Sequence, residues 1–232
     1  MRCRWSARWV ACSLSLSRLT TARAAVLAVA VAAAVAYSSW VLEWFLPGGV
    51  DPLRSYASEL AAVAEPHGTL FARADTASGT LLVALGALLW SGQGRLVPAG
   101  LVLWGGATVA DSFFRMPMVT TVGPGASAAL TEAEKSAVLV HSLCSSTAAV
   151  GMALVGAGLW LLARDRAGRM LAGVFLALLA MVAVTSGLHE VGGPNLWLGL
   201  WQRLSLAVAA AVIVTVAVAV TSAGSTARRE AS

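Results

Sequence analysis

The sequence predicts an all-α, polytopic membrane protein with six transmembrane helices and a short interfacial amphipathic helix after the first. Three observations predict this fold class. The 232 residues are 58% hydrophobic and only 12% charged, about half of the charged share of a soluble domain. The apolar residues form runs of about the 20 residues that cross a bilayer. The basic residues stand in short clusters between these runs, which favours a membrane topology over a nucleic-acid-binding surface.

The N-terminal part of the chain divides into a basic segment and a first apolar run. Residues 1–23 contain five arginines and no acidic residue, and we expect a disordered cytoplasmic N-terminus. Alternatively, this segment lies on an anionic membrane surface, or begins upstream of the natural start codon. Residues 24–45 also fit a signal peptide, but the run continues past Trp40 to an aromatic anchor at Trp44, which favours a transmembrane helix.

Residues 51–75 form the one long polar-rich segment of the chain. Asp51 and Pro52 suit the N-cap and the first position of a helix. The apolar residues that follow lie on one helical stripe, away from Glu59, until Glu65-Pro66 stops the pattern. At about 13 residues this helix is too short to cross a membrane, so we expect it to lie in the outer interface.

Five more helices are expected, at about residues 69–90, 96–114, 131–163, 170–188 and 197–220. A Gly-rich turn at 92–95 and a loop with Gly and Pro at 123–125 separate them. Thr131 and Glu134 form a capping box that begins the fourth helix. In that helix Ala149, Ala153 and Ala157 recur every four residues, a spacing that predicts close helix contact. The transmembrane domain therefore covers residues 24–221, and residues 222–232 form a cytoplasmic tail.

The distribution of charge predicts the orientation in the plasma membrane. Eleven of the 16 Lys and Arg residues lie in the N-terminus, the turns at 95 and 164–169, and the C-terminal tail. Nine of the 11 acidic residues lie on the opposite side. Because basic residues concentrate on the cytoplasmic side, we expect both termini of this multi-pass protein in the cytoplasm.

Each expected helix brings an ionisable residue to within about two turns of its outer end, where an unpaired charge is costly. Ten residues at this level are candidates for one polar cluster: Glu43, Glu59, His67, Asp75, Asp111, His141, His189, Glu190, Gln202 and Arg203.

The cluster has three interpretations. In the structural one, its acidic residues pair with Arg73, Arg115 and Arg203, and no cofactor is expected. In the second, the cluster binds or transports a small-molecule or lipid ligand, with Gln202 and Arg203 contacting an anion. In the third, a hydrolase of lipid-like substrates uses zinc to activate water. Its metal ligands would be His67, His141, His189 and Asp75.

Other function classes lack their motifs. The sequence contains no HExxH zinc motif, no phosphate-binding GxxxxGK[ST] and no GxGxxG after a strand. It has no nucleophile elbow for Ser-His-Asp catalysis. The three cysteines are too scattered for a disulfide framework. The expected partners are the lipid bilayer and a small-molecule or lipid ligand, not nucleic acid, and the sequence identifies no protein partner.

Several short motifs occur in a characteristic order. They are Ser58-Glu59-Leu60, Pro66-His67, Phe71, Asp75, His141 and Gln202-Arg203. With these motifs, residues 24–221 resemble the six-helix bacterial and archaeal membrane family known as domain of unknown function 998. The resemblance implies the six-helix topology and no established activity. The chain is also loosely similar to intramembrane hydrolases of the alkaline ceramidase type, which use Ser, Asp and three His, but it lacks the paired HxxxH of their last helix.

Overall fold

The computed structural model describes the backbone of residues 4–90, 94–122 and 129–230, and side chains between residues 21 and 222 within these ranges. The turn expected at 92–95 lies mostly outside the described residues, and so does the loop with Gly and Pro at 123–125. All regular structure in the described part is helical. The elements are α1 Arg4–Tyr37, η1 Ser39–Trp44, η2 Ala57–Ala61, α2 Gly68–Leu89, α3 Leu96–Phe113, α4 Glu132–Leu162, α5 Arg166–Glu190 and α6 Leu198–Glu230.

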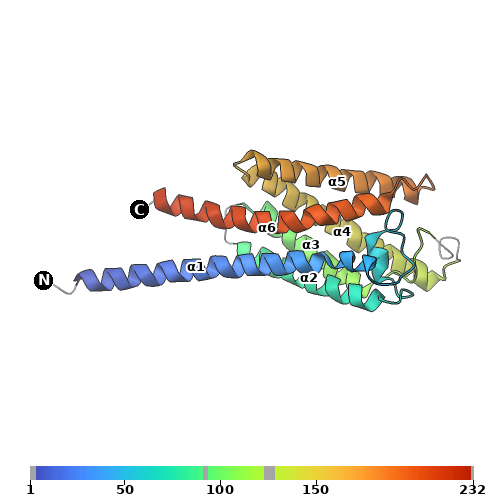
Figure 1. Cartoon of the computed structure of the whole chain (residues 1–232), viewed down its shortest axis with the longest axis horizontal. Helices are drawn as coiled ribbons and strands as arrows, with labels where there is room; N and C mark the ends of the chain where they lie inside the picture. Colours follow the sequence, from blue (N-terminus) through green and yellow to red (C-terminus); the bar gives the residue numbers. More distant parts are fainter. Residues whose placement is uncertain (1–3, 91–93, 123–128, 231–232) are drawn as a thin grey trace.

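The six α-helices lie side by side along one long axis (Figure 1). Both termini lie at one end of this bundle, which we call the inner end. The 3₁₀ helices η1 and η2 and the connections from α3 to α4 and from α5 to α6 lie at the other end, which we call the outer end. These two names follow the orientation that the charge distribution predicts.

Five helical segments of the described chain are long and apolar enough to cross a membrane. They are Thr21–Trp44, Leu96–Phe113, Glu132–Leu162, Arg166–Glu190 and Leu198–Ser222. The chain is therefore a polytopic, all-α membrane protein. Helix α2 completes the bundle between α1 and α3, but its first turns carry Arg73 and Asp75, so it is less apolar than the other five.

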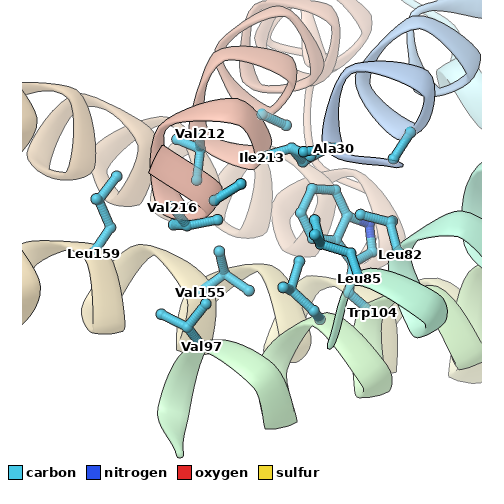
Figure 2. Packing of buried hydrophobic residues seen from close by; sticks show 14 of the residues in the cluster. Ala30, Leu82, Leu85, Val97, Trp104, Val155, Leu159, Val212, Ile213 and Val216 are labelled. Carbon is cyan, nitrogen blue, oxygen red and sulfur yellow. The ribbon is translucent and has the colours of Figure 1, made fainter. Parts of the chain in front are cut away.

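The hydrophobic core lies where α1, α2, α3, α4 and α6 meet (Figure 2), and Ala172 and Phe175 of α5 also belong to it. Trp104 of α3 is fully buried at its centre. The helices approach closely through glycines: a Cβ added at Gly100 of α3 would lie 2.8 Å from the carbonyl oxygen of Gly151 in α4. The predicted close contact of α4 therefore exists, and it forms at Gly151, the small residue between Ala149 and Ala153, and not at Ala149. Ala149 is exposed, and the neighbouring Gly151 makes the contact because it has no side chain.

The boundaries of α2, α3 and α4 agree with the predictions, but α5 begins at Arg166, inside the predicted turn at 164–169, and the first helix gives way to the 3₁₀ helix η1 after Tyr37. The capping box at the start of α4 is confirmed, since Thr131 Oγ1 accepts from Glu134 N and the Glu134 carboxylate accepts from Thr131 N. Residues 4–23, for which disorder was predicted, form the first part of α1. No Gly or Pro occurs between Arg4 and Tyr37, so no helix-breaking residue interrupts α1. Helix α6 likewise continues through most of the predicted tail.

The amphipathic helix predicted for residues 52–65 is wrong. Only the short 3₁₀ helix η2 forms there. Ser55 and Glu59, which the helical pattern placed on the polar face, are fully buried, and Leu53 of the apolar stripe is 48% exposed. The segment makes only short local bonds such as the one from Ser55 N to Asp51 O at 2.8 Å, and it also hydrogen-bonds to distant backbone, for example from Val63 N to Met116 O at 2.8 Å. We call residues 46–67 together with 114–122 the outer cap.

Candidate functional site at the outer end of the bundle

Arg203 in the second turn of α6 and Glu43 near the end of η1 form a buried ion pair. The guanidinium Nε and Nη2 each donate to one carboxylate oxygen at 2.6 Å. Both side chains are only 5% exposed. The remaining nitrogen, Nη1, donates to the carbonyl oxygens of Ser55 and Gly199 at 2.9 and 3.2 Å. Arg203 is therefore fully engaged, and it links α6 to η1 and to the outer cap.

Glu59 joins the two parts of the outer cap. Its Oε1 accepts from the Thr120 and Thr121 backbone nitrogens at 2.7 and 3.1 Å, and from the Thr120 hydroxyl at 3.1 Å. Its Oε2 accepts from Tyr56 N at 3.2 Å and from the Thr121 hydroxyl. Five donors converge on this one fully buried carboxylate, which is how a buried charged group becomes tolerable.

Arg115 also joins the two parts of the outer cap, and two contacts hold the outer cap to α5 and α6. Arg115 donates from Nε to Ala61 O at 2.6 Å and from Nη2 to Ala62 O at 3.0 Å. Gln202 Oε1 accepts from the backbone nitrogen of Ala57 at 2.6 Å. Tyr56 donates its hydroxyl to Glu190 Oε1 at 3.3 Å.

Burial raises the pKa of Tyr56 to about 12, and the nearby Glu190 adds to the rise, while a hydrogen bond with Ser186 opposes it. The Tyr56 hydroxyl therefore keeps its proton at neutral pH and remains a hydrogen-bond donor to Glu190.

A second group of polar residues lies between α2, α3 and α4. Asp111 near the end of α3 places its Oδ1 2.9 Å from His141 Nδ1 of α4, and its Oδ2 accepts from Ser145 Oγ at 3.1 Å. The same histidine nitrogen lies 3.2 Å from the carbonyl oxygen of Phe114. Only that second contact has hydrogen-bond geometry, so Asp111 Oδ1 is buried without an aligned donor in the described part of the chain.

Asp75 of α2 belongs to this second group, because it interacts electrostatically with both Asp111 and His141. The next residue, Thr76, shares a 2.8 Å hydrogen bond with Ser112 and so ties α2 to α3 at this level. Within the described residues, the Asp75 carboxylate has neither an ion pair nor a hydrogen bond. We call Asp75, Asp111 and His141 the carboxylate site.

The other two histidines lie elsewhere. His67 precedes α2 and lines a pocket of ≈ 60 Å³ with Glu43, Glu65 and Leu46, enough space for a few water molecules. His189 lies near the end of α5, and its Nδ1 is buried without a hydrogen-bond partner among the described residues. No three His, Cys, Asp or Glu side chains in the described part of the chain are grouped to hold a metal ion. The predicted zinc ligands are therefore not brought together.

The ten candidate residues thus fall into separate sets at the outer end instead of one cluster. Arg203 pairs with Glu43 and not with Asp75, Asp111 or Glu190, and Arg115 binds carbonyl oxygens. Sequence reasoning missed Ser55, Thr120 and Thr121, which complete the buried bonds of Arg203 and Glu59. The one local signal for Thr120 and Thr121 is that two threonines are adjacent in a loop, and such pairs are common. Ser55 has no such signal.

Comparison with known protein families gives one match. A family model described as a protein of unknown function (DUF998) matches residues 14–219. This range includes all six α-helical regions, the outer cap and the carboxylate site. No curated protein and no solved structure matches the chain.

Proposed function

This chain belongs to the DUF998 family of proteins of unknown function, and we propose that it is a ligand-binding membrane protein whose carboxylate site binds a small cation. The observation that carries this proposal is geometric: Asp75 and Asp111 lie at one level of the bundle, where Thr76 and Ser112 join α2 to α3. Among the described contacts the one basic side chain that reaches either carboxylate is His141, 2.9 Å from Asp111. With both carboxylates ionised, the site would have a net charge of −1 when His141 is protonated and −2 when it is neutral. Unbalanced charge among membrane-spanning helices is costly, and a bound cation removes this cost.

The contacts around the carboxylate site indicate that its carboxylates lack a basic partner within the protein. Two of the three basic residues that the structural interpretation assigned to these acids, Arg115 and Arg203, are engaged with Ala61, Ala62 and Glu43. The third, Arg73, is exposed and forms no ion pair within the described residues. The buried Oδ1 of Asp111 has no aligned donor in the described part of the chain, and a carboxylate oxygen in that state is a suitable ligand for a hard cation or an ammonium group.

The remaining candidate residues support a structural role for the outer cap. Glu43, Glu59, Gln202 and Arg203 are occupied by bonds within the protein. In particular, an anion-binding role for Arg203 would require breaking its bidentate pair with Glu43. We therefore assign the structural interpretation to the outer cap and the ligand-binding interpretation to the carboxylate site.

The experiment measures thermal melting of the purified full chain in detergent with different cations. Sodium, potassium and methylammonium chloride are each compared with the chloride of the bulky N-methyl-D-glucamine cation. A ligand at 100 times its dissociation constant stabilises the folded state by about 2.7 kcal/mol, so we expect a higher melting temperature with at least one small cation. Asp75→Asn removes one carboxylate charge, and this dependence on the cation should disappear.

Glu132→Gln is the matched control, because it removes an acidic charge at the exposed start of α4. It should keep the full cation response. Equal melting of the wild-type chain in all four salts would refute the proposal. If Asp75→Asn melts at a different temperature but still responds to the cation, Asp75 has a structural role and the site does not bind the cation.

We also propose the orientation of the chain in the plasma membrane, with both termini in the cytoplasm. The excess of basic residues at the inner end supports it, as does the position of both termini at that end (Figure 1).

The two other functional interpretations have weaker support. A zinc hydrolase would need His67, His141 and His189 to approach one another, and they lie on separate elements without forming a metal-binding group in the described chain. A transporter would use the carboxylate site to bind its cargo partway across the membrane. Uptake of the stabilising cation into vesicles that contain the protein would distinguish transport from binding alone.

A further inference from the structure

A second pocket lies at the inner end, independent of the carboxylate site: Trp160 of the pocket and His141 are separated by about 30 Å along α4. It has a volume of ≈ 380 Å³ and lies at the turn from α4 to α5, where Arg164, Arg166 and Arg169 line it together with Trp160 and Met170. Three arginines around one hollow concentrate positive charge at the level where a membrane presents its headgroups. From this arrangement we propose that the pocket binds the headgroup of an anionic phospholipid.

The arginines of the pocket are available to a ligand. The described contacts contain no hydrogen bond or ion pair of the Arg164 and Arg166 side chains, and both residues are exposed. Arg169 donates its Nε to the carbonyl oxygen of Ala163 at 3.1 Å, which fixes the guanidinium near the turn and leaves its other N–H groups free. Guanidinium groups bind phosphate through pairs of parallel hydrogen bonds.

The one acidic residue of the pocket is already engaged. Asp165 is the N-cap of α5, and its Oδ1 accepts from Gly168 N at 2.6 Å. There its charge is balanced mainly by the positive end of the helix dipole. The local charge that a phosphate would meet is therefore that of the three arginines, reduced by a carboxylate that is held against the backbone.

The surroundings of the pocket favour a lipid over a phosphate ion in solution. Trp160 is 48% exposed, Leu161 72% and Met170 58%, on helices long and apolar enough to cross the membrane. Tryptophan concentrates at the level of the headgroups. A Cβ at Gly173 would lie 3.1 Å from the Trp160 ring, so this glycine lets the indole lie close to α5. An anionic lipid would thus find charge for its phosphate and apolar side chains for its acyl chains.

The direct test is lipid binding to the full chain in detergent, measured by native mass spectrometry with dioleoylphosphatidylglycerol and dioleoylphosphatidylcholine. The wild type should bind the first phosphatidylglycerol more tightly than phosphatidylcholine. In the R164Q/R166Q variant the affinity for phosphatidylglycerol should fall roughly 30-fold, since each basic residue near an anionic surface contributes about a fivefold factor. Affinity for phosphatidylcholine should not change.

R54Q/R73Q is the matched control, because it removes two exposed arginines at the outer end. It should keep the preference for phosphatidylglycerol. If the affinity for phosphatidylglycerol falls equally in both variants, net charge explains the effect and the proposal is refuted. An unchanged affinity in R164Q/R166Q would also refute it. If inorganic phosphate displaces phosphatidylglycerol at equal concentration, the pocket binds a soluble anion and the lipid assignment is wrong.

A measurement on the wild type covers the case in which R164Q/R166Q does not fold. Raising the salt concentration from about 0.1 M to about 1 M shortens the Debye length from about 10 Å to 3 Å. Binding of phosphatidylglycerol to exposed arginines should then weaken at least tenfold, and binding of phosphatidylcholine should not. A salt-independent preference for phosphatidylglycerol would refute the arginine pocket.

Discussion

Arg203 is the residue whose environment differs most from that of an ordinary surface arginine. Four carboxylate and carbonyl oxygens accept its N–H groups, and the side chain is only 5% exposed. A buried ion pair gains little over a well-packed apolar pair, but loss of one partner leaves a buried charge without compensation. The pair therefore favours one arrangement of α6 against η1 more than it adds to the overall free energy of unfolding.

A double-mutant cycle tests this view of Arg203 and Glu43. Arg203→Gln should destabilise the folded protein in detergent by about 3–5 kcal/mol, because Glu43 stays buried without its partner. Glu43→Gln should have a similar cost. The double variant should lose clearly less than the sum of the two single losses. Additive losses in melting experiments would mean that the two side chains do not depend on each other.

At the scale of elements, the outer cap shows how a segment without a long helix is held in place. Within the described residues, its regular structure is the five-residue η2, and its fixed points are Glu59, Arg115 and the backbone bonds from Val63 and Ala64 to Met116 and Pro117. These bonds join parts of the chain that are about 55 residues apart. The outer cap borders the carboxylate site, because the carbonyl oxygen of Phe114 lies 3.2 Å from His141 Nδ1.

Glu59→Gln tests the role of this carboxylate. The side-chain amide of glutamine has one acceptor oxygen, whereas the carboxylate has two. At least one of the donors from Tyr56, Thr120 and Thr121 therefore loses its acceptor. An unsatisfied buried group costs about 1–3 kcal/mol. We expect faster hydrogen exchange at Val63 and Ala64. Glu65→Gln is the control, since Glu65 accepts one described hydrogen bond, from Gly49. Equal exchange in the two variants would contradict the role of Glu59.

The sequence predicted the long helices well because their signals are local. Apolar runs, the Thr131 capping box and Pro66 next to α2 act within a few residues of the boundaries they set. The outer cap could not be predicted in this way. The partners of Glu59 are Thr120 and Thr121, 61 and 62 residues away, so its helical pattern could not reveal that its carboxylate is buried.

The candidate site shows the same limit. Because consecutive helices run in opposite directions, the sequence placed Asp75, Asp111 and His141 at one end of the bundle, and they lie there in the structure. Which carboxylate meets which cation depends on how each helix is rotated about its axis, and no local pattern records that rotation. The sequence therefore predicted the end of the bundle at which the polar residues lie. The structure divides them between the outer cap and the carboxylate site. Whether the carboxylate site binds a ligand stays a prediction.

At the scale of the whole molecule, charge separates the two ends of the bundle. Basic residues dominate the inner end, where both termini and the arginine pocket lie, and nine of the 11 acidic residues lie toward the outer end. The two proposed sites fit this asymmetry. A cation approaching from outside would meet an acidic surface, and an anionic lipid of the inner leaflet would meet a basic one.

Accessibility of single cysteines in intact cells tests the orientation on which this argument rests. The native Cys3, Cys12 and Cys144 are first replaced by serine, and either Ala129→Cys or Ala167→Cys is then added; both alanines are exposed, one just before α4 and one at the start of α5. A membrane-impermeant maleimide should label Ala129→Cys in intact cells and Ala167→Cys only after lysis, because the basic turn at 164–169 is retained in the cytoplasm. The reverse pattern would place the arginine pocket on the outside and would require its lipid to come from the outer leaflet.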